Sequence, residues 1–289
     1  MRSLLRSLSR PTTLVDFEEA LQLPSFRDTA RLWFAGQALQ AFAYVDDYNN
    51  LWFEAAEEPP LEIRREIVAW AAGCVLRRDT DPNPTLDAVL DAGREWQIRL
   101  LEEAGFQVAP LRTLRFARSL EGELPEADLP DGFSLRAVKG EEEAQELVAL
   151  HRSAFGSEQM TVETRLAMMR TPHYDRRLDL LAIAPDRRPA AFCVCAIDEN
   201  DPRAGTTDPI GVHPDWRGRG LGRSITAAGL RALQTRGVLT VSLGTASDNL
   251  PMRGLAERLG FALVAEKVWF TKELTVQAAG AQYSPRNPD

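Results

Sequence analysis

One stretch decides the fold of this chain, and it runs from a strand through a basic, glycine-rich turn into a helix: Ile210-Gly211-Val212-His213-Pro214-Asp215-Trp216-Arg217-Gly218-Arg219-Gly220-Leu221-Gly222-Arg223. Gly218, Gly220 and Gly222 carry no side chain, so successive backbone N–H groups can converge there on one anion. The turn also opens a helix, whose N-terminus attracts negative charge. It lacks the G-x-G-x-x-G spacing of a dinucleotide site and the Lys-Ser/Thr of a P-loop. We therefore predict a pyrophosphate site at residues 217–222, named here the glycine turn, rather than a flexible surface turn.

The glycine turn fits the pattern Q/R-x-x-G-x-G/A, and here the chain resembles the GNAT acetyltransferases, which hold acetyl-CoA on this turn. The resemblance covers most of residues 132–274 and the first half of the chain only in outline. It implies an α/β fold with two GNAT-like domains in tandem, each a central mixed, mostly antiparallel sheet flanked by helices. It also implies acetyl-CoA as co-substrate and a set of cofactor-binding residues: Gly211, Val212, Arg217, Gly218, Arg219, Gly220, Leu221, Gly222, Arg223 and Asn249.

Length and charge narrow the class of protein. With 289 residues the chain exceeds the usual size of one domain, so we expect two, and its 44% hydrophobic content is ample for packed cores. A net charge of -8 disfavours binding to nucleic acid or to an anionic membrane, and would attract a cationic amine. The longest apolar run, residues 67–76, is too short to span a bilayer.

The cysteines and the N-terminus carry weaker signals. Cys193 and Cys195 have strand spacing that places both side chains on one face, and Cys74 stands apart. Because the three histidines are scattered, we predict buried, reduced cysteines, no metal site and a cytoplasmic setting. Residues 1–10 have the arginines of a transit peptide, but a plain N-terminal helix or frayed extension is favoured.

The first half of the chain has a recognisable order of elements. Strands are predicted at residues 38–45 and 51–56, followed by a helix whose apolar stripe includes Ile67 and Cys74. A second helix is predicted at residues 86–104, ended by Gly105, and an extended segment follows. A linker with little to bury is predicted at residues 119–132, where Glu, Asp, Pro and Gly gather. The predicted domains are 1–125, without a CoA site, and 126–276, with catalysis, followed by a disordered tail at 277–289.

The second half is predicted to contain these elements: a strand at 133–138, helices from Glu141 and at 161–170, a hairpin of strands at 178–184 and 190–198, a strand at 238–243, a helix capped by Asn249, and strands at 261–264 and 268–274. His151 lies on the apolar face of the first of these helices. A packed core histidine is therefore favoured over a catalytic one.

The two halves repeat. Leu100, Glu102, Gly105 and Phe106 recur, without gaps and 155 positions later, as Leu255, Glu257, Gly260 and Phe261. The elements around them follow in the same order, which predicts a second GNAT-like domain and a monomer with pseudo-dimeric halves. In that first half Glu57, Glu58, Pro59 and Pro60 replace the glycine turn. Acids repel a pyrophosphate and prolines have no N–H to donate, so we predict that this half binds no CoA.

The resemblance implies roles for single residues. The strand before the glycine turn separates from its neighbour in this family, and the backbone around Val212 would polarise the thioester carbonyl. Asp208 matches a position at which many members carry a carboxylate that serves as catalytic base, although the adjacent Pro209 also permits a turn role. Asn249 could contact the cofactor or cap its helix. Where the family often has a tyrosine as general acid, this chain has Ala256.

These observations predict an acetyl-CoA-dependent N-acetyltransferase that acts on a primary amine of a small molecule or peptide, with its active site in the second half. Tandem members of the family include mycothiol-synthase-like enzymes. The alternative is a non-catalytic acyl-CoA-binding or interaction module, which the missing tyrosine makes credible. The acceptor is selected in this family by the early helices and loops, here residues 151–174, which carry no recognisable code.

Overall fold

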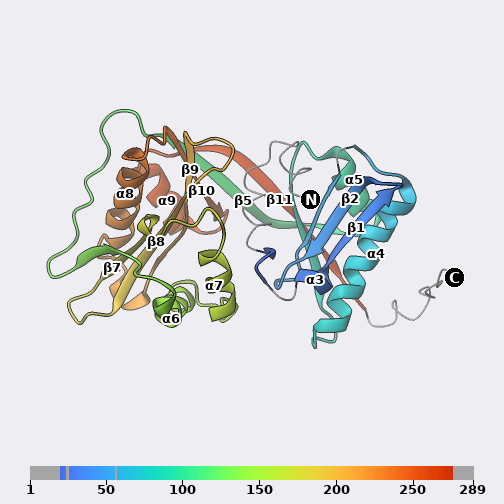
Figure 1. The fold of residues 1–289 in the computed structure, drawn as a ribbon, viewed down its shortest axis with the longest axis horizontal. Coiled ribbons are helices and arrows are strands. Elements are labelled where there is room, and N and C mark those ends of the chain that lie inside the picture. Colours follow the sequence, from blue (N-terminus) through green and yellow to red (C-terminus); the bar gives the residue numbers. More distant parts are fainter. Residues whose placement is uncertain (1–19, 24–25, 56, 276–289) are drawn as a thin grey trace. The chain divides into compact units, whose positions relative to one another are not determined.

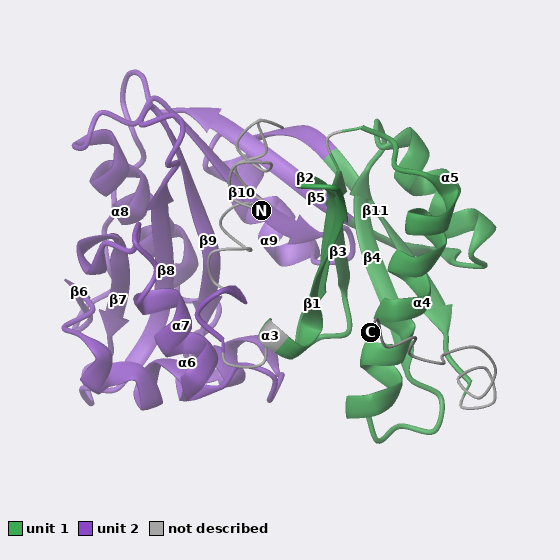
Figure 2. Cartoon of the chain, turned by 45° about the vertical axis from the view of Figure 1, so that its right-hand side comes forward, with its two compact units in different colours: residues 1–9, 24–112, 266–289 green, residues 10–23, 113–265 purple. Residues whose placement is uncertain are grey.

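The computed structural model describes residues 20–23, 26–55 and 57–275, so the predicted N-terminal extension and C-terminal tail lie outside the described residues. Contacts group the described chain into two units, coloured separately in Figure 2. Among the described residues, unit 1 contains 26–55, 57–112 and 266–275, and unit 2 contains 20–23 and 113–265. Along these residues no helix is both long and apolar enough to cross a membrane.

Unit 1 is built on a small antiparallel sheet, the short helix α3 and the longer helices α4 and α5 (Figure 1). Its elements are α3 (Phe26–Thr29), β1 (Ala30–Ala35), β2 (Ala38–Val45), β3 (Leu51–Ala55), α4 (Leu61–Arg78), β4 (Thr85–Asp91) and α5 (Glu95–Glu103). The strands pair in the order β1-β2-β3. The α4 stripe is buried at Ile67, Ala71 and Cys74, as its helical spacing predicts.

The helix predicted at residues 86–104 is wrong in its first part. Leu86, Ala88 and Leu90 are buried at alternate positions, which is the pattern of a strand, and they belong to β4. Gly93 follows in a short turn, and α5 begins only at Glu95. Both a strand and a helix place apolar residues at short intervals, and here pairing with a distant strand decides between them.

Unit 2 is a larger mixed sheet with helices on both faces (Figure 1). Its elements are β6 (Ser134–Ala137), η1 (Glu141–Glu143), α6 (Ala144–Phe155), α7 (Val162–Met169), η2 (Arg176–Leu178), β7 (Asp179–Ile183), β8 (Pro189–Ile197), β9 (Ala204–Val212), η3 (Pro214–Trp216), α8 (Leu221–Gln234), β10 (Thr240–Ala246) and α9 (Leu250–Arg258). Antiparallel pairs join β6 to β7, β7 to β8 and β8 to β9, whereas β9 and β10 are parallel.

Alternation along β8 assigns the two faces of this sheet. Cys193 and Cys195 are buried in the cluster that contains α8, and Phe192 and Val194 are buried in the cluster that contains α6 and α7. The two thiols share one face, as predicted, with their Sγ atoms 3.6 Å apart. Gly229 of α8 packs directly on them, because a Cβ there would lie 2.7 Å from the Cys195 Sγ.

Two long strands are exchanged between the repeats. β5 (Gln107–Ser119) follows α5 in sequence but pairs with β10 of unit 2, and β11 (Ala262–Glu273) follows α9 but pairs with β4 of unit 1. The predicted separate pieces 261–264 and 268–274 are therefore one strand. The repeat is exact in register, since β10, α9 and β11 each begin 155 positions after β4, α5 and β5.

Each exchanged strand also caps a helix of the other repeat. The Arg118 guanidinium on β5 donates to the Leu259 carbonyl at the end of α9. The Lys272 ammonium on β11 donates to the Ala104 carbonyl at the end of α5, at 2.6 Å. A cation suits both places because helix C-termini carry partial negative charge and unpaired carbonyls.

The boundaries between the two units lie near residues 112 and 265, because β5 and β11 are exchanged. The domains predicted from sequence change at residues 125 and 276 instead. The expectation that the linker buries little is wrong, because Leu120 and Leu124 belong to the core of unit 2. Side chains of α8 hold this segment by its backbone: Gln234 donates to the Leu120 carbonyl at 2.6 Å, and Arg231 donates to the Leu124 carbonyl at 3.1 Å.

Candidate acetyl-CoA site

The glycine turn presents a row of unused backbone donors. Gly218 and Gly220 have φ of 74° and 85°, the left-handed region that only glycine enters freely. None of the N–H groups from 218 to 223 donates to an acceptor in the described part of the chain, and the first bond of α8 runs from the Ser224 N–H to the Gly220 carbonyl. A Cβ built on Gly218 or Gly220 would meet nothing within 4 Å. The turn is therefore open to an anion.

The arginines around this turn are held in different ways. Arg217 donates to the Ala154 carbonyl at 2.6 Å, which ties the turn to the end of α6. The Arg219 guanidinium lies over the Trp216 ring, 4.9 Å from its centroid. Arg223 is exposed on the first turn of α8 and pairs with no acid among the described residues. All three add positive potential beside the free N–H groups.

The strand before the turn separates from β10, as the resemblance implied. β9 and β10 pair only over Ala204 to Thr206, although β9 continues to Val212. The His213 N–H donates to the Ala190 carbonyl on β8 at 2.8 Å. Since hydrogen-bonded and non-bonded pairs alternate in an antiparallel ladder, the Val212 N–H points away from β8, to the side on which β10 has separated. Gly211 faces α6 instead, where a Cβ would clash with Phe192.

Asp208 lies at the base of this opening. A bulge in β9 places Asp208 and Pro209 between the paired residues Thr207 and Ile210, and the bond between them is cis. The Asp208 side chain is exposed, and its Oδ2 accepts the Gly244 N–H of β10 at 3.3 Å. The carboxylate therefore bridges the two strands where their ladder ends, and it remains accessible to solvent.

Asn249 and Ala256 occupy the helix beyond β10. The Asn249 Oδ1 accepts the Met252 N–H at 3.2 Å, so this side chain caps α9. Ala256 is completely buried in the core of unit 2. Its position offers neither a proton donor nor a path to solvent, and the general acid stays unassigned.

His151 is a packed residue. Its ring lies 4.6 Å from the Phe155 ring and 5.7 Å from the Phe192 ring, and its Nδ1 is buried without a hydrogen-bond partner in the described structure. Burial, with a smaller effect of Arg165, lowers the pKa of His151 to about 4. The imidazole is therefore neutral at physiological pH.

This shift gives a testable pH dependence. In the unfolded chain the histidine titrates near its ordinary pKa of about 6.5, so between about pH 4 and 6.5 the unfolded state binds more protons. We expect the free energy of unfolding to fall as the pH drops through that window, and the His151→Phe variant to lose this part of the slope. Urea unfolding at pH 5 and pH 7 measures it. Equal slopes in the two proteins would contradict a buried, neutral His151.

A buried ion pair holds α7 on the face of the unit 2 sheet that α6 also covers. Arg165 on α7 and Asp179 on β7 form a salt bridge with side-chain exposures of 7% and 1%, and the Tyr174 hydroxyl donates to Asp179 at 2.7 Å. Burial, followed by the nearby Asp179 carboxylate, raises the pKa of Tyr174, so its phenol is protonated at all physiological pH values. These contacts hold α7 and the segment after it against β7.

Unit 1 has the corresponding place filled. A single parallel bridge joins Asn50, the residue before β3, to Asp87 of β4, and in the described structure β3 and β4 belong to different sheets. Arg94, which lies 155 positions before Asn249, donates to both oxygens of Glu54 on β3, and the two side chains are only 11% and 3% exposed. No sequence signal identified this pair. It puts protein charge where unit 2 has an opening.

The segment in place of the glycine turn is built differently from its counterpart in unit 2. Pro60 is the N-cap of α4, with no side-chain hydrogen bond to the helix, and the preceding Glu58 pairs with Arg64 and Arg99. Glu58 thus already has two cationic partners, and neither proline has an N–H. Nothing in this segment corresponds to the row of free donors in unit 2.

Comparison with known proteins agrees with this geometry. Residues 144–261 match the acetyltransferase (GNAT) family. This segment is therefore similar to the GNAT family of acetyltransferases. Among curated proteins it is similar to mycothiol acetyltransferases: 34% identical over 167 residues to that of Arthrobacter sp. (strain FB24), covering 55% of this chain and 52% of the relative. The chain thus spans about half the length of the curated relatives that it matches.

Solved structures share the fold over most of the chain. A tandem GNAT protein from the clavulanic acid biosynthesis pathway superposes with a TM-score of 0.67 at 18% identity, covering 93% of this chain and 89% of that one. A GCN5-related N-acetyltransferase from Sphaerobacter thermophilus gives 0.66 at 21% identity, covering 85% and 80%. The particular architecture is therefore a tandem GNAT fold, and the predicted fold class is confirmed.

Proposed function

We propose that this protein is an acetyl-CoA-dependent N-acetyltransferase with one active site, in unit 2, and that its acceptor is a primary amine of a small molecule or peptide. The observation that carries the proposal is the row of unused N–H groups from 218 to 223 on the glycine turn, beside the opening between β9 and β10. The match to the GNAT family over residues 144–261 and the likeness to mycothiol acetyltransferases support acetyl transfer. The buried, unbridged cysteines are compatible with a cytoplasmic setting.

In this proposal the backbone does most of the binding. The N–H groups of the glycine turn would hold the pyrophosphate, and the positive end of α8 would add to them. The acetyl-pantetheine arm would lie between β9 and β10, and the Val212 N–H, which points away from β8, would donate to the thioester carbonyl. Because Asn249 already caps α9, its oxygen is engaged, and only its amide NH₂ would be available to the cofactor.

The matched variants Gly220→Asp and Gly220→Asn test the cofactor site. Both side chains tolerate the left-handed conformation of Gly220 better than most residues and enter open space, so they differ mainly in charge. A carboxylate about 6 Å from a phosphate costs about 3 kcal/mol at an effective dielectric constant of about 20. We expect Gly220→Asp to bind CoA about 100-fold more weakly than Gly220→Asn in calorimetry. Equal affinities would refute the site.

Asp208 is proposed as the base that accepts a proton from the acceptor amine, directly or through water. An alkyl ammonium with a pKa near 10.4 is almost fully protonated at neutral pH, so a base at the opening is useful. We expect Asp208→Asn to lower kcat by about 100-fold, and to remove the low-pH limb of its pH profile, while CoA affinity stays unchanged. In this variant the side-chain carbonyl oxygen can still accept the Gly244 N–H, so the contact between β9 and β10 survives. An unaltered profile would transfer the role to water or to the substrate.

A single site per chain follows from the difference between the units. Glu54 and Arg94 fill the opening of unit 1, and prolines replace its glycine turn. Titration should therefore give one CoA per chain. The competing function, a non-catalytic acyl-CoA-binding module, predicts the same stoichiometry but no release of free thiol from acetyl-CoA against a panel of amines.

A further inference from the structure

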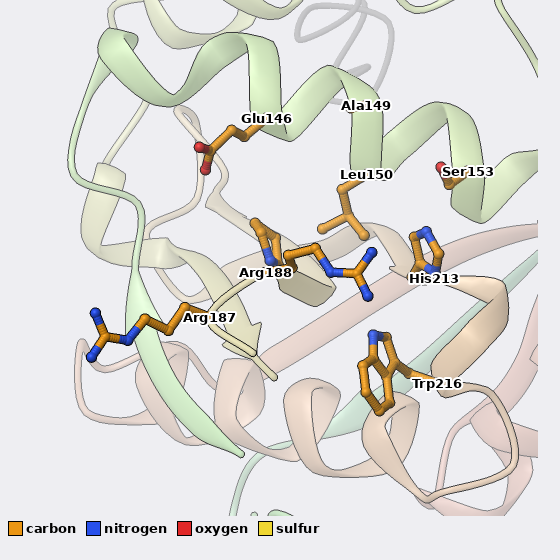
Figure 3. A pocket seen from close by; sticks show the side chains of 9 residues that line it. Glu146, Ala149, Leu150, Ser153, Arg187, Arg188, His213 and Trp216 are labelled. Carbon is orange, nitrogen blue, oxygen red and sulfur yellow. The ribbon is translucent and has the colours of Figure 1, made fainter. Parts of the chain in front are cut away.

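A cavity of about 320 Å³ lies in unit 2 beside the segment that leads from β9 into the glycine turn. Three elements line it (Figure 3): α6 with Glu146, Ala149, Leu150 and Ser153, the β7–β8 hairpin turn with Arg187, Arg188 and Pro189, and the segment around η3 with His213 and Trp216. We call it the hairpin pocket. Its volume is within the usual range for small-molecule sites.

Hydrogen-bond donors predominate in the hairpin pocket. The Ser153 hydroxyl and the Trp216 indole N–H have no partner among the described residues. The His213 Nδ1 accepts the Asp215 N–H at 3.2 Å, so a neutral imidazole carries its proton on Nε2. Figure 3 shows the Arg188 guanidinium reaching between Leu150 and Trp216 toward His213.

The acids around the pocket engage part of this donor set and leave the rest unused, and the Asp215 Oδ2 lies 3.7 Å from the His213 Nδ1. Asp186 accepts from the Nε and Nη2 of Arg188, both at 2.8 Å, which leaves the Nη1 of that guanidinium unused. Asp215 lies near Arg188 as well. Glu146, on α6, is the one carboxylate that lines the cavity. An occupant rich in acceptors, a carboxylate or a phosphate, fits this set of groups.

Arg187 lies at the rim of the pocket, and Figure 3 shows its guanidinium extending away from Arg188 and His213. It has φ of 69° in the hairpin turn, where glycine or asparagine is the usual residue, and its side chain forms no ion pair or hydrogen bond within the described chain. The left-handed backbone conformation of Arg187 costs free energy, and no contact of its side chain within the described chain offsets that cost. Binding something outside the fold would account for its presence.

The hairpin pocket is joined to the glycine turn by two contacts. Trp216 lies under the Arg219 guanidinium, and Arg217 is bonded to the Ala154 carbonyl, one residue beyond Ser153. An occupant that touches Trp216 and Ser153 would therefore contact both elements that position the turn.

We propose that the hairpin pocket binds a small organic anion, held by Arg188, His213, Ser153 and the Trp216 indole, with Arg187 at the rim. The anion has two possible sources. The first is the 3′-phosphate end of the bound cofactor, and this alternative rests on the proposed function. The second is a separate small molecule that binds beside the cofactor.

Calorimetry with three probes distinguishes these sources: CoA, dephospho-CoA, which lacks the 3′-phosphate, and adenosine 3′,5′-bisphosphate. The variants are Arg188→Gln and Arg187→Gly, with Arg177→Gln as the control, since Arg177 is an exposed arginine outside the pocket. If the cofactor is the source, Arg188→Gln weakens CoA about tenfold and leaves dephospho-CoA unchanged. If the anion is separate, CoA affinity is unchanged, and the bisphosphate binds to the CoA-saturated protein about tenfold more weakly in Arg188→Gln than in wild type.

Arg187→Gly adds a second readout. Because glycine relieves the left-handed backbone, this variant should melt about 2 °C higher than wild type while binding the same probe more weakly. The proposal is overturned if neither arginine variant differs from Arg177→Gln with any probe. A protein that fails to bind CoA but binds the bisphosphate through Arg188 would refute the proposed function and leave the hairpin pocket standing.

Discussion

Glu54→Ala is expected to destabilise the protein by about 3–5 kcal/mol, although Glu54 lies in the unit without a proposed active site. The substitution removes the acceptor of both Arg94 hydrogen bonds, one of them 2.9 Å long, and leaves a guanidinium in a place only 11% exposed. A buried charge without a partner is the largest penalty that a single side chain can produce. Urea unfolding monitored by circular dichroism measures the loss.

Two controls make this prediction specific. The double variant Glu54→Leu with Arg94→Met replaces the pair by apolar side chains of similar volume and should remain within about 1–2 kcal/mol of wild type. Glu58→Ala removes exposed ion pairs with Arg64 and Arg99 and should cost less than about 1 kcal/mol. If Glu54→Ala were as mild as Glu58→Ala, solvent would reach Arg94, and the opening of unit 1 would not be filled as described.

A fragment that begins at residue 126, the start of the second domain predicted from sequence, is expected not to fold. It lacks β5, the antiparallel partner of β10, and with it Leu114, Phe116, Leu120 and Leu124 of the unit 2 core. At about 1.5–3 kcal/mol for each buried side chain, the four contribute about 6–12 kcal/mol, as much as the whole stability of a typical domain. The Arg118 cap on α9 is lost as well.

The matched fragment begins at residue 106 and so keeps β5. We expect cooperative thermal unfolding from this fragment and none from the one that begins at residue 126, as followed by near-ultraviolet circular dichroism. A cooperative transition in the shorter fragment would mean that β10 is stable as an edge and that the exchange of β5 is dispensable.

The parts of the fold that sequence predicts are those that local chemistry determines. Gly105 and Gly260 both end helices in the left-handed region, with φ of 85° and 79°, and the residue after each packs into a core. The repeat could be found because these local signals recur at a constant offset. β4 was missed because its identity depends on pairing with β11, whose residues lie far along the chain.

The candidate site also contains features that local sequence predicts and features that depend on residues far apart in the chain. The free N–H groups of the glycine turn follow from glycine spacing at a strand-to-helix junction, and Asn249 performs the capping role that its position before a helix allowed. Glu54 and Arg94 are 40 positions apart, and no local pattern joins them. Arg187 and Arg188 were correctly placed in a hairpin turn, but only the fold brings that turn against α6 and η3.

The exchange of strands also determines when the protein can fold during its synthesis. β4 emerges from the ribosome long before β11, because residues 92–261 must be translated between them. At about 5–20 residues per second this takes roughly 10 to 35 seconds. Throughout that time β4 lacks its antiparallel neighbour, and an unpaired strand edge is open to pairing with other chains. The first unit to be made is thus among the last to be completed, and the newly synthesised chain depends on its final strand for protection from aggregation.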